Sequence, residues 1–177
     1  MSQCSFSWAE EGVGGNSPVC RGRFASTASA RFRILERYRR VAMVGLSANQ
    51  YRPSHFAAIY LIAAGYDIVP VNPREREILG RTCYPSLLAI PGGVEVVDIF
   101  RDPSAVPELV EDAIAIGAKV VWMQLGVIHN AAAERACAAG LEVVMDRCMK
   151  IEHARFFGGL TTVGLNTAVI SSRPRPR

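Results

Sequence analysis

The chain has 177 residues, of which half are hydrophobic, and it carries a formal net charge of +4. This length and composition are typical of one globular domain with a substantial core, so a wholly disordered protein is excluded. Charged residues such as Asp67, Asp98 and Lys119 interrupt every long apolar run, so we expect no membrane-spanning segment and no membrane partner.

The excess of positive charge lies at the two ends of the chain. Residues 1–40 carry seven basic and three acidic side chains, and residues 151–177 carry four and one. Residues 41–150 carry nine basic and twelve acidic side chains, so the central part offers no basic surface to a polyanion. We expect the basic ends to be solvated rather than to bind nucleic acid.

The cysteines show neither a C-x-x-C pair nor histidine partners at zinc-finger spacing. An odd number of cysteines, with no signal-peptide pattern at the start, indicates reduced thiols in the cytoplasm. We therefore predict a cytoplasmic location, no disulfide framework and no metal site. The five residues are Cys4, Cys20, Cys83, Cys137 and Cys148.

The N-terminal part is expected to lie outside the main domain. Residues 1–30 are rich in Ser, Gly, Ala and Arg without a sustained period, which predicts a loose extension. An organelle transit peptide is an alternative, but Glu10 and Glu11 argue against it. Residues 31–40 predict a short basic helix that leads into the first strand.

A strand, a glycine turn, a helix and a second strand are predicted between residues 41 and 74. The apolar run 41–44 breaks at Gly45 into a polar loop, and the apolar run 67–71 is the second strand. Between them, Pro53 suits the first helical position and Gly65 suits the position after the helix. We expect this helix to bury one face, formed by Phe56, Ile59, Tyr60 and Ala63. Its first N–H groups lack partners within the helix, so they are a suitable place for a phosphate.

The remaining chain continues the alternation of strands and helices. Strands are predicted at 94–100, 119–124 and 141–145, with helices from about Pro103 and over 130–139. This alternation predicts an α/β fold: a Rossmann-like open parallel sheet of about five strands with helices on both faces.

The expected organisation is therefore one domain with two extensions. Residues 31–150 form the Rossmann-like domain, within which residues 75–91 are a connector. Residues 151–177 are expected to pack along the domain edge before their basic end frays.

Turn-forming and basic residues follow every predicted strand. In an open parallel sheet, ligands bind beyond the carboxyl ends of the strands, so these residues are candidates for a binding site. The alternative is that they only form turns, as strand ends commonly do. The segments are 45–54, Asn72-Pro73-Arg74, Phe100-Arg101, Gln124-Leu125-Gly126 and 146–148.

The first of these segments favours a phosphate-bearing ligand. The hydroxyls of Ser47 and Ser54 can hydrogen-bond a diphosphate beside the helix start, and Arg52 offers a forked cationic donor. Arg74 and Arg101 follow neighbouring strands and suit a further phosphate.

Two common nucleotide sites are not supported by the sequence. A nicotinamide dinucleotide site requires a second glycine after Gly45 and an acidic residue after the second strand, where this chain has Asn72. A nucleoside triphosphate site requires G-x-x-x-x-G-K-S/T, and no such run exists. Flavin remains an alternative without a positive signal.

Several segments in order match one family of proteins. They are VGLS followed by RPS, GYDIVPVNP, EILG, Tyr84 with Ser86-Leu87, DIFR, AIAIGAKVVWMQLG, AGL and VMDRC. From Val41 through Arg147, about three fifths of the chain, the sequence resembles the single-domain coenzyme A-binding proteins. These are related to the nucleotide-binding domain in the alpha subunit of succinyl-CoA ligase. The segment GLNTAVISSR is similar to the tail of a bacterial subgroup.

The resemblance implies coenzyme A (CoA), or an acyl-CoA, held across the strand ends. It places the diphosphate at Gly45, Ser47, Arg52, Pro53 and Ser54. It places the adenosine part between Asn72-Pro73-Arg74 and Phe100-Arg101, and the pantetheine arm beside Gln124-Leu125-Gly126.

Catalysis by this chain alone is not expected. The related ligases need a phosphorylated histidine from a second domain and an ATP-grasp part, for which the chain has no room. His55, His129 and His153 show no catalytic constellation in the sequence. Cys148 lies near the implied thiol arm and is either inert or able to form a mixed disulfide.

Three hypotheses follow. The first is a non-catalytic module that binds CoA or acyl-CoA. The second is a subunit or accessory of a CoA ligase or of another enzyme with a nucleotide cofactor. The third is an interaction protein that uses its basic ends. A protein partner or a homo-oligomer is left open.

Overall fold

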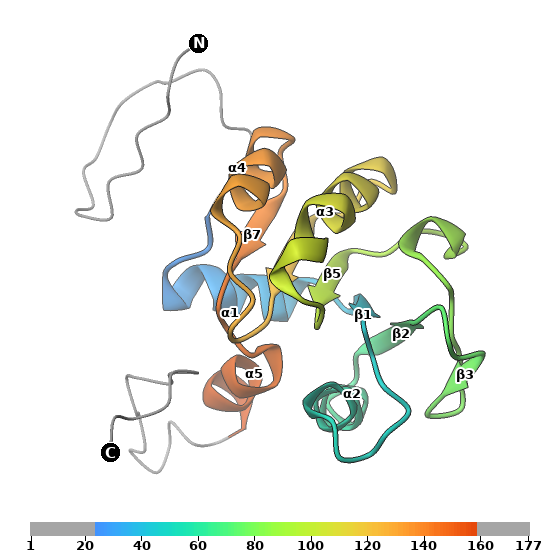
Figure 1. The fold of residues 1–177 in the computed structure, drawn as a ribbon. Helices are drawn as coiled ribbons and strands as arrows, with labels where there is room; N and C mark the ends of the chain where they lie inside the picture. The colour runs from blue at the N-terminus through green and yellow to red at the C-terminus, as the bar shows by residue number, and fades with distance from the viewer. Residues whose placement is uncertain (1–23, 159–177) are drawn as a thin grey trace, which may run out of the picture.

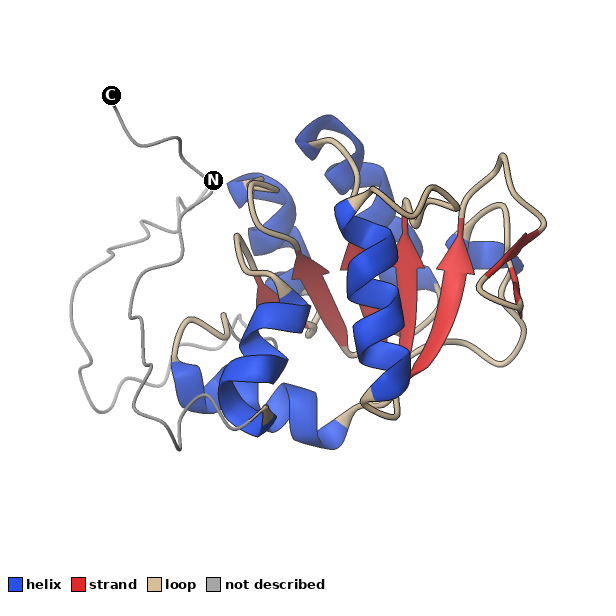
Figure 2. Cartoon of the chain, turned by 90° about the horizontal axis from the view of Figure 1, so that it is seen from below, coloured by secondary structure: helices blue, strands red, loops and turns tan. Residues whose placement is uncertain are grey.

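The computed structural model describes residues 24–158, whereas the ends, 1–23 and 159–177, lie outside the described residues. Five parallel strands form one sheet in the order β2-β1-β5-β6-β7. Figure 2 shows their arrowheads pointing to one edge, with helices on both sides, which confirms the predicted Rossmann-like α/β fold. The strands are β1 (Arg40–Val44), β2 (Asp67–Val71), β5 (Val96–Ile99), β6 (Val120–Met123) and β7 (Glu142–Val144).

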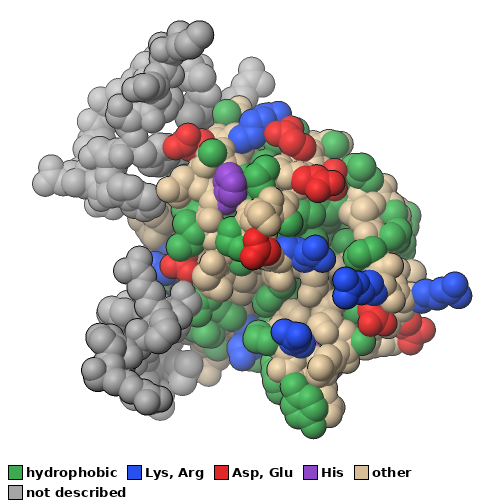
Figure 3. All heavy atoms as spheres, viewed as in Figure 1, with side chains coloured by type: hydrophobic (Ala, Val, Ile, Leu, Met, Phe, Trp, Pro, Cys, Tyr) green, Lys and Arg blue, Asp and Glu red, His purple; other side chains and the backbone are tan. Residues whose placement is uncertain are grey.

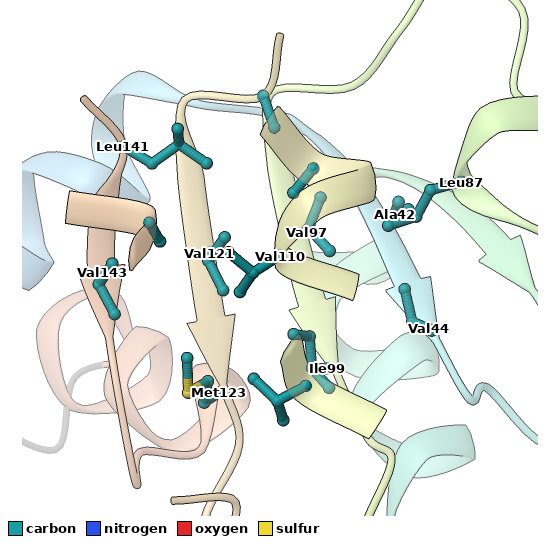
Figure 4. Packing of buried hydrophobic residues seen from close by; sticks show 14 of the residues in the cluster. Ala42, Val44, Leu87, Val97, Ile99, Val110, Val121, Met123, Leu141 and Val143 are labelled. Atoms are coloured by element: carbon teal, nitrogen blue, oxygen red, sulfur yellow. The ribbon is translucent and has the colours of Figure 1, made fainter. Parts of the chain in front are cut away.

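Alternating strand residues supply two cores, one on each face of the sheet. On one face, Val97 and Ile99 of β5 and Val121 and Met123 of β6 point toward Val110 of a covering helix (Figure 4). The helices on this face are α3 (Val106–Ala115) and α4 (Asn130–Ala138), and a short 3₁₀ turn, η2 (Pro103–Ala105), precedes α3.

The other face is covered by three helices, visible around the sheet in Figure 1: α1 (Ala28–Arg37), α2 (Pro53–Ala63) and α5 (Met149–Phe157). Helices α1 and α5 pack together, and a buried ion pair joins them. Arg31 Nε donates to Glu152 Oε2 at 2.8 Å. Phe32 also lies 5.1 Å, centroid to centroid, from Phe157. None of the helices in residues 24–158 is long and apolar enough to cross a membrane.

The buried face of α2 differs from the predicted one. Phe56 and Ile59 are 53% and 47% exposed, whereas Ala57, Ala58 and Leu61 are fully buried. The prediction was wrong because α2 is apolar around most of its circumference, and the small alanines, not the larger side chains, let the helix lie close to the sheet.

Other elements were not predicted. The connector 75–91 contains a hairpin, β3 (Glu77–Ile78) with β4 (Arg81–Thr82), and a 3₁₀ turn, η1 (Leu87–Ala89). The short helix predicted over 31–40 is α1, but it begins at Ala28, after the capping side chain of Thr27, within the residues expected to form a loose extension. Helix α5, which begins at Met149, was not predicted. The expected basic frayed end falls outside the described residues.

Candidate functional site

The strand order creates a crevice at the carboxyl edge of the sheet. Counting only the strands of the main sheet, the order is 2-1-3-4-5, so the chain leaves β1 in one direction and later returns to β5 on the other side. Val44 at the end of β1 pairs with Val71 of β2 and with Ile99 of β5. The loops after β1 and β5 therefore diverge, which is where open α/β sheets bind ligands.

A cavity of about 920 Å³ lies at this edge. All the predicted site residues line it except Pro73 and Gly126. Pro73 instead lines a smaller cavity of about 190 Å³, which shares Gly45 and Arg101 with the larger one. The Gly126 N–H donates to Asp146 Oδ1 at 2.7 Å, so it fixes the turn after β6. The larger cavity is lined by Gly45, Ser47, Tyr51, Arg52, Pro53, Ser54, Phe56, Asn72, Arg74, Phe100, Arg101, Gln124, Leu125, Val127, Cys148, Lys150 and Ile151.

Gly45 joins the ends of β1 and β5 at close range. Its φ is +85°, and a Cβ there would lie 2.9 Å from Arg101 Cδ and 3.0 Å from the carbonyl oxygen of Phe100. Its N–H donates to Val71 O at 2.9 Å. A glycine is therefore required both by the backbone conformation and by the space available.

The loop after β1 is shaped by its own polar groups. The Ser47 N–H donates to Ser54 Oγ at 3.2 Å, and Ser47 Oγ accepts from the Asn49 N–H at 3.1 Å. His55 Nδ1 lies 2.9 Å from Ser47 O. Both serine hydroxyls thus hold the loop in place, and each hydroxyl proton remains available to donate to a ligand.

The N-terminus of α2 opens onto this cavity. Arg52 is the N-cap residue, and no side chain caps the first turn. Pro53 follows at the first helical position, and the lining residues Arg52, Pro53 and Ser54 place this turn at the cavity wall. An uncapped helix N-terminus favours an anion.

Asn72 ties two loops together. Its Nδ2 donates to Leu46 O at 2.9 Å, and its Oδ1 accepts from the Arg74 N–H at 3.0 Å. The side chain therefore fixes the loop after β1 against the loop after β2, and its amide is engaged on both sides.

Four cations line the cavity: Arg52, Arg74, Arg101 and Lys150. No carboxylate lines it, and none of the four belongs to the ion pairs found within residues 24–158. Figure 3 shows basic side chains gathered in the middle of the visible face, between α3 and α2. Unpaired cations that surround one cavity favour a polyanionic ligand. Lys150 was missed because it belongs to α5, a helix that the sequence did not predict.

A buried acid lies behind the cavity wall. Asp98 is fully buried in β5, and its Oδ1 accepts from Gln124 Nε2 at 2.7 Å. Its Oδ2 is buried without a hydrogen-bond partner. Burial raises the pKa of Asp98 to about 8, against the lowering effect of the Gln124 hydrogen bond. Asp98 was not predicted as a site residue, although the sequence showed it as one acidic residue inside the apolar run of a predicted strand.

Cys148 precedes α5 and lines the cavity. Burial raises the pKa of this thiol, and hydrogen bonds from the backbone of Ile151 and Lys150 act in the opposite direction. No group of histidines, cysteines and carboxylates in the described part of the chain is arranged to hold a metal ion.

The profile of the family described as "CoA binding domain" matches residues 39–154, well over half of the chain. The chain belongs to this family. The resemblance predicted from the sequence motifs is therefore confirmed, and the CoA-binding domain accounts for all five strands of the sheet.

Relatives of two kinds are similar to this CoA-binding domain protein. The uncharacterized protein YneT of Bacillus subtilis is 38% identical, over 68% of this chain and 90% of its own. Acetate–CoA ligase [ADP-forming] I of Archaeoglobus fulgidus is 29% identical over 62% of this chain, but the match spans only 17% of the ligase.

Solved structures of similar proteins share the fold. A hypothetical protein from Pyrococcus horikoshii has a TM-score of 0.71 at 46% identity, covering 73% of this chain and 91% of its own. Prb, a PH1109 protein redesigned for binding, has a TM-score of 0.74 at 45% identity, covering 76% and 95%.

Proposed function

We propose that this chain binds CoA or an acyl-CoA in the cavity at the carboxyl edge of the sheet, without catalysis of its own. The observation that carries the proposal is the set of four unpaired cations around one cavity beside an uncapped helix N-terminus. CoA carries a diphosphate and a 3′-phosphate, so its charge complements these groups. Membership of the CoA-binding domain family supports this ligand over other polyanions.

The proposed arrangement follows the cavity from one strand end to the next. The diphosphate lies at the loop of Gly45, Ser47 and Ser54, where Arg52 and the α2 N-terminus face it. The adenosine part lies between the segments 72–74 and 100–101, close to the smaller cavity that Pro73 lines. The pantetheine arm runs beside Gln124 and Leu125 toward Cys148.

Binding is tested by calorimetry on the full chain with CoA, and by thermal stability with CoA, acetyl-CoA, NAD and FAD. A ligand that binds only the folded protein adds roughly 2.7 kcal/mol to the free energy of unfolding at a hundredfold excess over its Kd. We expect stabilisation by CoA and acetyl-CoA, and none by NAD or FAD. Absence of stabilisation by CoA would refute the proposal.

Arg52→Ala tests the location of the site, with Arg135→Ala as the matched control. Arg135 is a half-exposed arginine on α4 that pairs with Glu111 and does not line the cavity. Hydrogen bonds to charged groups contribute about 1.5–3 kcal/mol, so Arg52→Ala should weaken CoA binding by roughly 10- to 100-fold. Equal affinities of the two variants would show that the site lies elsewhere.

A second candidate function is that of a subunit which presents CoA to a ligase partner. It is favoured by the match to part of the Archaeoglobus fulgidus acetate–CoA ligases. The chain alone, mixed with CoA, acetate and ATP, should give no acetyl-CoA under either hypothesis. Turnover that appears only when a partner protein is added would favour the second one. Both candidate functions are consistent with a cytoplasmic location.

A further inference from the structure

Cys148 has a setting that differs from that of the other described cysteines. It is the N-cap residue of the nine-residue helix α5, and it lines the large cavity together with Lys150 and Ile151. The backbone groups of Lys150 and Ile151, in the first turn of α5, act on the Cys148 sulfur and lower its pKa, although burial raises it more. A helix N-terminus and a nearby lysine both stabilise a thiolate.

A second observation, the unpartnered acid Asp98, marks the same place. Because Val97 and Ile99 belong to the core under α3 and α4, Asp98 points to the opposite face of the sheet, where α5 packs, and its charge acts on Cys148. Its Oδ1 holds the amide of Gln124, which lines the cavity, while its fully buried Oδ2 has no partner. Most buried polar atoms in native folds have a hydrogen-bond partner, so an unpaired one requires an explanation, and a role in a site is one such explanation.

The charge of Asp98 bears on the thiol. Burial raises the pKa of Cys148 most, and a carboxylate at Asp98 raises it further. Because burial keeps Asp98 largely protonated at neutral pH, most molecules place no negative charge beside a Cys148 thiolate. Lys150 and the α5 N-terminus then act on the sulfur without that opposing charge.

We propose that Cys148 forms a mixed disulfide with the thiol of CoA, by exchange with CoA disulfide. The inference rests on the proposed function, because the bound nucleotide brings the reacting sulfur to Cys148. The Cys148 thiolate attacks one sulfur of CoA disulfide, and the S–S bond of the reagent breaks. Cys148 is oxidised to the mixed disulfide, and the other CoA leaves as a thiolate that takes up the proton released by Cys148.

The test treats the reduced full chain with CoA disulfide and measures intact mass, followed by peptide mapping. We expect one added CoA, less two hydrogen atoms, on Cys148. Cys148→Ser should take up none. Cys83→Ser is the matched control, because burial raises the pKa of the Cys83 thiol as it does that of Cys148, but Cys83 does not line the cavity. This control should react like the wild-type chain.

Two comparisons separate a guided reaction from general thiol reactivity. Oxidised glutathione has the same disulfide chemistry without the nucleotide, and it should react at least about tenfold more slowly, because binding raises the effective concentration of CoA disulfide at Cys148. An excess of a CoA analogue that lacks the thiol should slow the reaction with CoA disulfide.

The outcomes distinguish this inference from the proposed function. If the wild-type chain binds CoA in calorimetry but Cys148 remains unmodified, or if glutathione disulfide reacts equally fast, the inference is overturned and CoA binding stands. Modification that maps to another cysteine overturns it as well. If neither the wild-type chain nor Cys148→Ser binds CoA, both proposals fail. Mapping on the wild-type chain keeps the test decisive even if Cys148→Ser does not fold.

Discussion

Replacement of Gly45 by alanine should destabilise the protein more than the same change at Gly65. Both glycines have a left-handed backbone, with φ of +85° and +88°. A Cβ at Gly65, just after α2, meets nothing within 4 Å, whereas at Gly45 it meets Arg101 Cδ at 2.9 Å and Phe100 O at 3.0 Å. The pair therefore separates the cost of backbone conformation from the cost of crowding.

The magnitudes follow from these contacts. A non-glycine residue in the left-handed region costs roughly 1–2 kcal/mol, which both variants should lose. Overpacking adds about 1–3 kcal/mol at Gly45 alone. The Phe100 carbonyl cannot retreat freely, because the Phe100 N–H donates to Val44 O at 2.8 Å and holds the end of β5 against β1. We thus expect a loss of about 1–2 kcal/mol for Gly65→Ala and about 2–5 kcal/mol for Gly45→Ala.

Urea unfolding followed by far-ultraviolet circular dichroism measures both losses, provided the two variants unfold with the same dependence on urea. Gly45→Ala should also weaken CoA binding, because relief of the contact displaces Arg101 from the cavity wall, and Gly65→Ala should not. Equal free energies of unfolding for the two variants would refute the crowding argument.

Three further changes give measurable outcomes. Between the ordinary pKa of an aspartate, near 4, and the folded value of about 8, folded Asp98 keeps a proton that the unfolded chain has released. The free energy of unfolding should therefore fall by roughly 1 to 1.5 kcal/mol per pH unit across that window, and Asp98→Asn should remove this contribution in urea titrations at pH 5 and pH 7. Glu152→Ala leaves the buried Arg31 without this ion pair and should lower the free energy of unfolding by about 3–5 kcal/mol. Replacing both partners by apolar residues should lower it much less, and calorimetry on the two variants measures the difference. Leu61→Ala should cost about 2–5 kcal/mol and Ile59→Ala little, in the same urea assay; similar losses would contradict the observed face of α2.

The sheet was predictable because each of its strands and turns is determined by a short run of consecutive residues. Pro53 at the start of α2 and Gly65 after its end fixed the first crossover, and the carboxyl ends of the strands identified the edge that carries the cavity. Most of the candidate residues could therefore be named in advance, since proximity at this edge follows from parallel strands alone.

What could not be predicted depends on contacts between distant residues. Helix α5 was missed because two of its buried residues, Glu152 and His153, are polar and hide the apolar face. Glu152 is buried with two partners, Arg155 in the same helix and Arg31, which lies 121 residues earlier in the chain. Lys150 was not predicted to line the cavity because it belongs to this unpredicted helix.

The short hairpin β3–β4 was missed because only two residues of each strand pair. Its turn places Leu79 and Gly80 at φ of 55° and 70°. Leucine is not a residue that favours this turn conformation, so the sequence did not predict a hairpin here. The segment EILG was recognised only by its similarity to the family.

The contact between α1 and α5 has a consequence for how this domain is joined to others. The first and last helices of the described domain cover the same face of the sheet and are joined by Arg31 and Glu152. In a longer polypeptide, the segments before α1 and after α5 would therefore extend from helices in the same layer of the domain.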